Sequence, residues 1–368
     1  MNQTSPSPSA DAVRAALARV VDPHTGQDLV AANAVRGVGV DGGKVAIELQ
    51  LGYPAAGWHG ALTAEIQRVL AAEVPGVAQV TVGIATRVLA HRVQKELTPL
   101  PEVRNIIAIA SGKGGVGKST TAVNLALALA AEGARVGVLD ADIHGPSIPM
   151  MLGMSGKPES PDNKNISPML AHGLQAISIG LFLGEDTPAI WRGPMTTQYL
   201  VQLLTTTLWH DLDYLVIDLP PGTGDIQLTL AQRIPVSAAV IVTTPQDIAL
   251  LDARRALKMF EKVEVPVLGI VENMAVHVCS KCGHAEHVFG EGGGERMAAQ
   301  YGLPLLGSLP LDIRIREQAD GGRPTVVAEP ASAIALAYRE IARKAAGRLS
   351  LQARNKSIAF PSIVVQNT

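Results

Sequence analysis

The chain has 368 residues, of which 47% are hydrophobic, and this length suits one large domain with its own core plus a smaller one. Its 33 acidic and 31 basic residues give a net charge of -2, and no stretch concentrates lysine and arginine, which argues against nucleic acid as a partner. The first ten residues lack the features of a secretion signal and no apolar run is long enough to cross a membrane, so we expect a cytoplasmic protein with no membrane partner.

The pattern of residues 1–92 predicts a small α+β domain. Two strand-like runs flank Asp41-Gly42-Gly43, whose glycines can adopt the positive φ of a tight hairpin. Residues 93–104 are polar and contain Pro99 and Pro101, which indicates a linker. The expected helices are Asp11–Val20 and Ala61–Ala72, and the expected strands are Ala34–Val40, Lys44–Leu51 and Ala78–Ile84.

Residues 105–347 repeat the order strand, turn, helix. Their apolar runs are short and nearly unbroken, as expected for strands buried on both faces of a sheet. We therefore predict an α/β fold, a doubly wound and mostly parallel sheet preceded by the small α+β domain. A last helix is expected over Ser332–Ala346, and residues 348–368 are expected to form a C-terminal tail. The expected strands are Ile106–Ala110, Arg135–Asp140, Leu174–Ile179, Tyr214–Asp218, Ala238–Thr243 and Val267–Glu272.

A glycine-rich loop follows the first of these strands and opens a helix expected over Thr120–Ala131. Gly112, Gly114 and Gly117 match a dinucleotide-binding fingerprint, with Asp140 near the position of a ribose-binding acid. The loop also matches the phosphate-loop (P-loop) pattern G-x-x-x-x-G-K-[ST], whose lysine and hydroxyl have a use only where phosphates and Mg²⁺ are held. We therefore predict that it binds ATP rather than NAD. The nucleotide-binding residues expected in this loop are Gly112, Lys113, Gly114, Gly115, Val116, Gly117, Lys118, Ser119 and Thr120.

The polar residues in and after this loop have separate expected roles. Lys118 is expected to bridge the terminal phosphates as a catalytic residue, and Ser119 to ligate Mg²⁺. Asp142 is expected to orient or activate the attacking water, and Asp218, at the end of a Walker B-like strand, to reach Mg²⁺ through water. The Gly/Pro loop at residues 220–225 is expected to sense the γ-phosphate. A single aspartate at a strand end is more often a cap, but two in order behind a P-loop favour function.

Lys113 is a second lysine that an ordinary P-loop does not need. The run KGGVGKS resembles the deviant Walker A motif of the SIMIBI-class ATPases, which include septum-positioning, partition and arsenite-pump members. In that class the extra lysine reaches the partner's nucleotide, so the resemblance implies a homodimer that sandwiches ATP and a catalytic role for Lys113. It also implies that Asn273 binds the adenine edge, the alternative being a simple strand-end cap.

Cys279 and Cys282 are the only cysteines and form one C-x-x-C pair. A redox dithiol would favour a thioredoxin-like unit, which is not evident. A zinc site in one chain would recruit His277, His284 or His287. A third reading uses two chains, because two thiolates are half of the four that an iron–sulfur cluster usually takes and a twofold axis would complete the set. The pair alone favours zinc or redox chemistry, but the dimer implied by the P-loop brings two such pairs together.

The combination of SGKGGVGKST, DADIHGPS, VIDLPPGTGD, IVENM, the C-x-x-C pair and FGEGGGERMAAQYG resembles the Mrp/ApbC-type iron–sulfur cluster carriers, over about Asn105 to Arg343. The preceding module resembles a domain of other iron–sulfur maturation proteins, but it has no cysteine. The resemblance implies a cluster, 4Fe–4S in preference to 2Fe–2S, that is bound by the cysteines of both chains. It further implies cluster assembly scaffolds and apo iron–sulfur proteins as partners, with ATP hydrolysis coupled to loading or transfer.

A partition or septum-positioning ATPase is the competing interpretation. It would need a basic surface or a terminal amphipathic anchor, and the region after Gly347 offers only scattered basic residues. It would also leave the cysteines unexplained. A zinc-binding P-loop ATPase is the other alternative.

Overall fold

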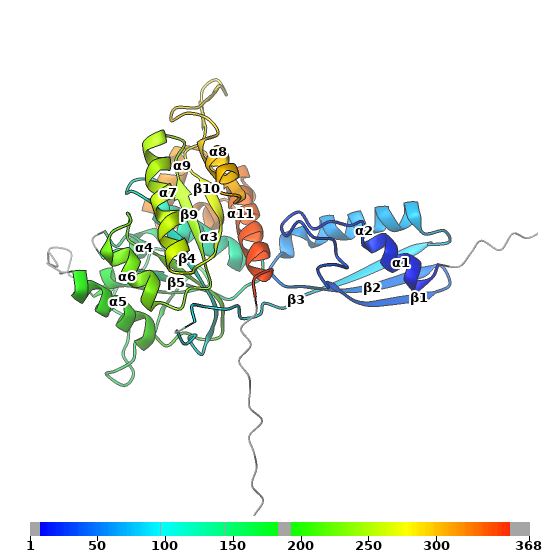
Figure 1. Cartoon of the computed structure of the whole chain (residues 1–368), viewed down its shortest axis with the longest axis horizontal. Coiled ribbons are helices and arrows are strands. Elements are labelled where there is room, and N and C mark those ends of the chain that lie inside the picture. The colour runs from blue at the N-terminus through cyan, green and yellow to red at the C-terminus, as the bar shows by residue number, and fades with distance from the viewer. Residues whose placement is uncertain (1–7, 96, 144, 183–192, 354–368) are drawn as a thin grey trace, which may run out of the picture.

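The structure is a computed structural model that describes residues 8–95, 97–143, 145–182 and 193–353. Glu96 of the expected linker, His144 beside Asp142, and most of the expected C-terminal tail lie outside the described residues. In Figure 1 a small unit, drawn in blue, lies beside a larger α/β unit and meets it near the end of the last helix. None of the helices in the described part is both long enough and apolar enough to cross a lipid bilayer.

The small unit is a three-stranded sheet covered by two helices. Strands β1 and β2 pair antiparallel through Asp41 and Lys44, and Gly42 has a φ of 54°, so the expected glycine hairpin is confirmed. Strand β3 joins β2 in parallel. Alternate residues of β2 are buried because one face of the sheet packs on the helices. The elements are α1 (Ala10–Leu17), β1 (Val35–Asp41), β2 (Lys44–Leu51), a 3₁₀ turn (Ala56–Trp58), α2 (His59–Glu73) and β3 (Gln79–Thr86).

The large unit is built on a sheet of eight strands within the described residues, in the order β13-β10-β9-β4-β8-β5-β7-β6. All neighbours pair in parallel except β6, which runs antiparallel to β7 at one edge. The predicted α/β fold, a doubly wound and mostly parallel sheet with a small α+β domain before it, is confirmed. The strands are β4 (Val103–Ala110), β5 (Val136–Asp140), β6 (Met169–Ala171), β7 (Leu174–Ser178), β8 (Leu212–Asp218), β9 (Ala238–Thr243), β10 (Val267–Glu272) and β13 (Leu305–Ser308).

Helices cover both faces of this sheet, and the central strand β4 shows how. Ile107 and Ile109 belong to the core formed with α3 and α11, whereas Ile106 and Ala108 belong to the core formed with α5 and α6. This alternation is the two-residue period of a strand buried on both faces. The helices are α3 (Lys118–Ala131), α4 (Ile148–Met151), α5 (Gly193–Thr206), α6 (Asp225–Arg233), α7 (Asp247–Lys262), α8 (Gly293–Gln300), α9 (Ile313–Asp320), α10 (Thr325–Ala328) and α11 (Ala333–Ser350), with a 3₁₀ turn at Ile179–Leu181.

The last helix is longer than the sequence indicated. Helix α11 begins after Ser332, whose side chain accepts a hydrogen bond from Ala335 N, and it continues to Ser350. The predicted end at Ala346 was wrong: the apolar pattern does not continue after Gly347, yet Gly347 is buried within the helix against His24. A Cβ at this position would lie 3.2 Å from His24 O, so glycine allows the two units to pack closely here.

The carboxyl ends of β4, β5 and β8 meet at one edge of the sheet. Asp218, the last residue of β8, pairs with Ile109 on one side and with Asp140 on the other. The P-loop leaves β4 at this same edge and leads into α3. Polar residues that are distant in the sequence are thereby brought together where ligands bind in open α/β sheets.

Candidate functional site

The P-loop is a tight turn between β4 and α3. Gly117 is the N-cap of α3 with a φ of 80°, and Gly115 has a φ of 79°, a backbone region that glycine adopts without strain. Helix α3 begins at Lys118, two residues earlier than predicted, so the free N–H groups of its first turn face the loop. This arrangement suits an anionic group such as a phosphate.

Lys118 lies among three predicted site residues. Its Nζ donates to Asp218 Oδ1 at 2.6 Å and to Ser119 Oγ at 3.3 Å, and it lies 3.7 Å from Asp142 Oδ2. The side chains of Lys118 and Asp218 are 6% and 0% exposed, so this ion pair is shielded from water. The fold therefore brings the predicted phosphate-binding lysine, the Mg²⁺ ligand and both acidic residues into one cluster.

The carboxylates in this cluster are affected by burial. Burial raises the pKa of Asp218, and the opposing attraction of Lys118 offsets this only in part. Burial also raises the pKa of Asp140 to about 7, with a further contribution from the negative charge of Asp218. Asp140 Oδ2 accepts hydrogen bonds from Ser178 Oγ and Ile148 N, and Asp140 Oδ1 accepts one from Asp142 N. Asp140 therefore shapes the loop that carries Asp142, and it is not available as a ribose ligand for NAD.

The donor set of this cluster fits Mg²⁺. Asp218 Oδ2 is buried and has no hydrogen-bond partner among the described residues, which leaves one carboxylate oxygen for a cation or for a water bound to one. The Ser119 hydroxyl lies beside the same carboxylate, because Lys118 Nζ donates both to Ser119 Oγ and to Asp218 Oδ1. Carboxylate, hydroxyl and water oxygens are the ligands that Mg²⁺ takes in nucleotide sites.

The loop at residues 220–225 lies against the P-loop. Gly222 N donates to Ser111 O at 3.0 Å, and Gln227 of α6 donates to Pro221 O. Gln227 was missed by the sequence reasoning, because nothing in its local pattern distinguishes it from an ordinary helix residue. Its contact fixes the loop that we expected to sense the γ-phosphate.

Asn273 contacts the P-loop through its side chain. Its Nδ2 donates to Val116 O at 2.9 Å, and its backbone N donates to Thr243 O at 2.7 Å. A Cβ on Gly117 would overlap Asn273 Nδ2, so the residue at position 117 must be glycine for this contact to form. Asn273 is therefore a support of the loop in this structure, and its contact with adenine stays a prediction.

The other end of the P-loop packs against α7. A Cβ on Gly112 would overlap the backbone of Asp252. We expect Gly112→Ala to lower the free energy of unfolding by roughly 1–3 kcal/mol, because a backbone contact cannot move aside as a side chain can. It should also weaken ATP binding, because the loop would be displaced. Urea denaturation and nucleotide titration measure the two effects.

Gly60→Ala is the matched control for this substitution. Nothing lies within 4 Å of a Cβ at Gly60, which is inside α2. Alanine there should be neutral or stabilising by up to about 1 kcal/mol, through helix propensity. Equal unfolding curves for the Gly112→Ala and wild-type chains would contradict the overlap.

Lys113 is half-buried in the P-loop, and its carbonyl accepts a hydrogen bond from Ser111 Oγ at 2.9 Å. The side chain of Lys113 has no ion pair or hydrogen bond with any residue in the described ranges. Its predicted reach to a partner's nucleotide therefore stays a prediction.

The two cysteines lie in the turn of a short hairpin, and the segment that contains it projects from the large unit in Figure 1. The hairpin is formed by β11 (His277–Val278) and β12 (Ala285–Glu286). Cys279 N donates to His284 O, and Gly283 N to Cys279 O, which closes the turn around the pair. Backbone N–H groups of Lys281 and Cys282 lower the pKa of the Cys279 thiol, which favours the thiolate that binds metals.

The histidines near the cysteines do not complete a metal site in one chain. His277 and His287 each hydrogen-bond a backbone carbonyl through Nδ1, of Leu311 and Ala275 respectively. Within the ranges that the structure describes, no three His, Cys, Asp or Glu side chains lie close enough together to hold a metal ion. The hairpin thus offers two sulfur ligands, and none of the described residues of the same chain adds a third protein ligand.

Two family models match the chain. One, described as NUBPL iron-transfer P-loop NTPase, matches residues 102–346, and the other, described as iron-sulfur cluster assembly protein, matches residues 10–82. An iron-sulfur cluster carrier protein from Pseudomonas fragi is 60% identical over 269 residues, which are 73% of this chain and 94% of the relative. One from Escherichia coli K12 is 49% identical over 360 residues, which are 96% of each chain.

A solved structure gives the same result. The nucleotide-binding protein of Archaeoglobus fulgidus in complex with ADP is 38% identical, with a TM-score of 0.55 over 63% of this chain and 90% of that chain. The family model over residues 102–346 covers both the P-loop and the cysteine hairpin. On these findings and on its own site geometry, the chain belongs to the family of NUBPL iron-transfer P-loop NTPases.

Proposed function

We propose that this protein is an ATP-hydrolysing iron–sulfur cluster carrier that binds a labile cluster through Cys279 and Cys282 of two copies and transfers it to apo-proteins. The observation that carries the proposal is the cysteine hairpin, which supplies two thiol ligands and no third ligand from the described residues of its own chain. A cluster usually takes four thiolates, so a twofold pair of hairpins would supply the full set. The names of the relatives support the same cargo.

The nucleotide chemistry follows from the cluster around Lys118. The Lys118 ammonium, which donates to Asp218 in this structure, would donate to the terminal phosphate oxygens when ATP is bound. The N–H groups of the P-loop would hold the other phosphates. Asp142, near Lys118 and only partly buried, would orient the attacking water. Mg²⁺, when held by Ser119 and through water by Asp218, would neutralise charge on the phosphates. Lys113 would act on the nucleotide of a partner chain.

The partners follow from the same reasoning. We propose a homodimer that contains bound ATP, a 4Fe–4S rather than a 2Fe–2S cluster as cargo, and cytoplasmic cluster scaffolds and apo iron–sulfur proteins as donors and acceptors. Contacts to the γ-phosphate at the loops carrying Asp142 and residues 220–225 would favour one dimer arrangement over another and so change the exposure of the cluster.

Coupling between hydrolysis and transfer is testable with Asp142→Asn. We expect ATP hydrolysis to fall about a hundredfold, which is the typical contribution of a positioned general base. Cluster loading by anaerobic reconstitution should be unchanged, because the cysteine hairpin is intact. Transfer to an apo-ferredoxin, followed by its visible absorbance in the presence of ATP, should slow in parallel with hydrolysis.

Asp320→Asn is the matched control, since it removes the same charge from an exposed pair with Arg316 on α9. It should hydrolyse ATP and transfer the cluster like the unmodified chain. Unchanged transfer by Asp142→Asn at a hundredth of the hydrolysis rate would disprove the coupling but leave the carrier function in place.

A further inference from the structure

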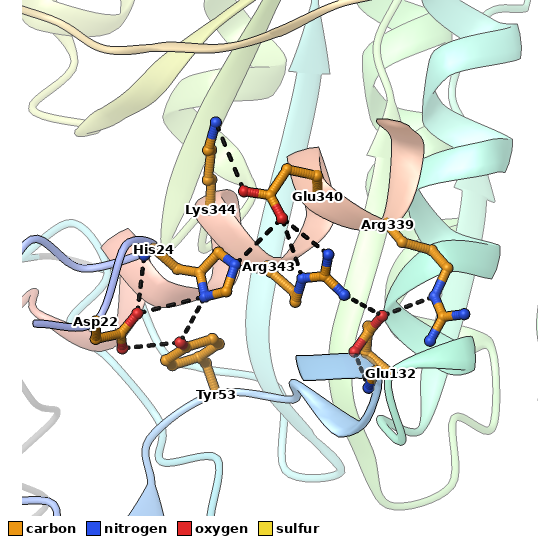
Figure 2. Close-up of polar contacts among 9 residues, drawn as sticks. Asp22, His24, Tyr53, Glu132, Arg339, Glu340, Arg343 and Lys344 are labelled. Atoms are coloured by element: carbon orange, nitrogen blue, oxygen red, sulfur yellow. Dashed lines mark hydrogen bonds and ion pairs between the residues drawn. The ribbon is translucent and has the colours of Figure 1, made fainter. Parts of the chain in front are cut away.

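The small unit meets the large one through a row of charged side chains that neither the nucleotide site nor the cysteine hairpin uses. Figure 2 shows this row, in which Glu340 lies between His24 and Arg343, and Glu132 lies between Arg343 and Arg339. We call it the charged seam. It consists of Asp22, His24 and Tyr53 from the small unit and Glu132, Arg339, Glu340 and Arg343 from the large unit.

His24 is the centre of the seam, and its side chain is only 1% exposed. Its Nδ1 lies 2.9 Å from Tyr53 Oη and 3.3 Å from Asp22 Oδ1, and its Nε2 lies 3.2 Å from Glu340 Oε2. The Tyr53 hydroxyl donates its one proton to Asp22 Oδ2 at 2.8 Å, so it can only accept from His24. Both ring nitrogens therefore face acceptors, and both must donate. Only the protonated imidazolium has two N–H groups.

The surroundings of His24 favour the same charge state. Its facing charged groups are Asp22 in its own loop and Glu340 on α11, while Trp58 lies edge-on with ring centroids 4.9 Å apart. Burial alone lowers the pKa of His24, but the hydrogen bonds to Asp22 and Glu340 outweigh it and raise the pKa above 6.5. Burial raises the pKa of Tyr53, so its hydroxyl stays neutral. The hydrogen bond from His24 lowers the pKa of Glu340 to about 2.

The other half of the seam is anchored on the helix that starts at the P-loop. Glu132 is the C-cap residue of α3, and its side chain is fully buried. It accepts from Arg339 Nε at 2.7 Å and Arg343 Nη1 at 2.9 Å, and also from Gly57 N of the small unit at 2.7 Å. Arg343 also pairs with Glu340 at 2.8 Å. Positive and negative groups thus alternate without interruption from the small unit to the end of α3.

We propose that the charged seam is a docking surface that fixes the small unit at the C-terminal end of the P-loop helix, and that it holds only while the His24 ring is protonated. Loss of the proton would leave one nitrogen of the almost completely buried ring as a bare acceptor that faces either the Glu340 carboxylate or the Tyr53 oxygen. Because the native pKa is raised, the stabilisation is complete below 6.5, the ordinary value, and is lost as pH rises through the native pKa. The small unit then separates from α11 at alkaline pH.

The first test is the charge of His24 in the full chain. The ring Cε1–H signals of the histidines are followed by NMR from pH 5 to pH 9, and His24→Gln identifies the signal of His24. We expect the pKa read from that signal to lie above 6.5, the ordinary value for histidine. Asp22→Asn, which keeps the shape but removes one of the two facing carboxylates, should move it toward lower pH. A His24 signal that titrates at or below 6.5 would overturn the proposal.

The second test is docking itself. Small-angle X-ray scattering and tryptic cleavage at Arg92 and Lys95, in the segment between the units, are compared at pH 6.5 and pH 9. His24→Gln and Glu340→Gln should raise the cleavage rate at pH 6.5 by about tenfold or more and increase the maximum dimension, since each removes one partner of a pair in which the His24 ring is almost completely buried. Both variants should be insensitive to pH over this range.

Two controls make the outcomes decisive. His210→Gln changes an exposed histidine outside the seam and should behave like the unmodified chain at each pH. Glu340 is 36% exposed, so Glu340→Gln should fold even if His24→Gln does not. If His24 is charged but Glu340→Gln leaves scattering and cleavage unchanged, the His24–Glu340 pair does not hold the small unit against α11. The proposal would then fail.

Discussion

Replacing Lys118 with alanine is expected to abolish nucleotide turnover and, separately, to destabilise the protein without nucleotide. Hydrolysis should fall by at least about a hundredfold, as when one preorganised donor to a developing charge is removed. Stability should fall because Asp218 would keep a buried charge without its partner at 2.6 Å. Removing one partner of a buried pair typically costs about 3–5 kcal/mol, an upper limit here because Asp218 can take up a proton instead. ATP hydrolysis and urea denaturation measure the two losses.

The double variant Lys118→Ala with Asp218→Asn separates these effects. It removes both charges, so most of the lost free energy of unfolding should return, while hydrolysis stays absent. Lys113→Ala is the companion control, because Lys113 has no ion pair within the described residues and its loss should leave stability unchanged. If the double variant were as unstable as Lys118→Ala, the buried pair would not be the cause.

Loss of either cysteine should have the other large effect. We expect Cys279→Ser and Cys282→Ser each to prevent retention of an iron–sulfur cluster, because serine does not offer the soft thiolate that iron takes in these clusters. ATP binding should be unaffected, since the hairpin shares no residue with the P-loop cluster. Anaerobic reconstitution, with iron and sulfide counted per chain, gives the result, and one cluster for every two chains is expected.

Histidine variants of the same hairpin separate this cluster from a zinc site. His277→Gln and His287→Gln remove two of the three ring nitrogens that a single-chain zinc site could use, and the same substitution at His284 removes the third. Under the proposed function all three variants retain the cluster in full. Loss of metal from these variants, or a colourless chain that binds one zinc alone, would instead support the zinc alternative.

The inner strands of the large sheet were predictable because turn-forming residues bound them. The limits of β9 and β10 agree with the prediction, and Pro266 and Asn273 mark the two ends of β10. The edge strands β6 and β13 were missed. They span only three and four residues, too few for an apolar run to be distinguished from a loop.

The P-loop cluster was predictable because its residues follow the ends of parallel strands in order. Lys118, Asp142 and Asp218 come together for that reason, although their functional roles stay predictions. The role of Asp140 was not predictable, because it depends on hydrogen bonds from Ile148 at the start of α4 and from Ser178 at the end of β7, which no local pattern reveals. The division of the chain at residues 92, 104 and 347 also stays a prediction.

The charged seam had no counterpart in the sequence reasoning. His24 and Glu340 are 316 residues apart, and Gly57 and Glu132 are 75 apart. Each of these residues looks like an ordinary surface residue within its own segment. Contacts between side chains so far apart in the chain leave no signal in the local sequence around either residue.

The position of α11 has a consequence for how the chain matures on the ribosome. This helix packs on α3 and β13, and its side chains Tyr338, Ile341 and Ala345 are almost completely buried. Helix α3, which begins at the P-loop, therefore lacks the apolar residues of α11 that cover it until α11 has been synthesised. Nascent chains in which α11 is still inside the ribosome should be incompletely folded and dependent on chaperones. Every residue that we expect to bind ATP has left the ribosome by then.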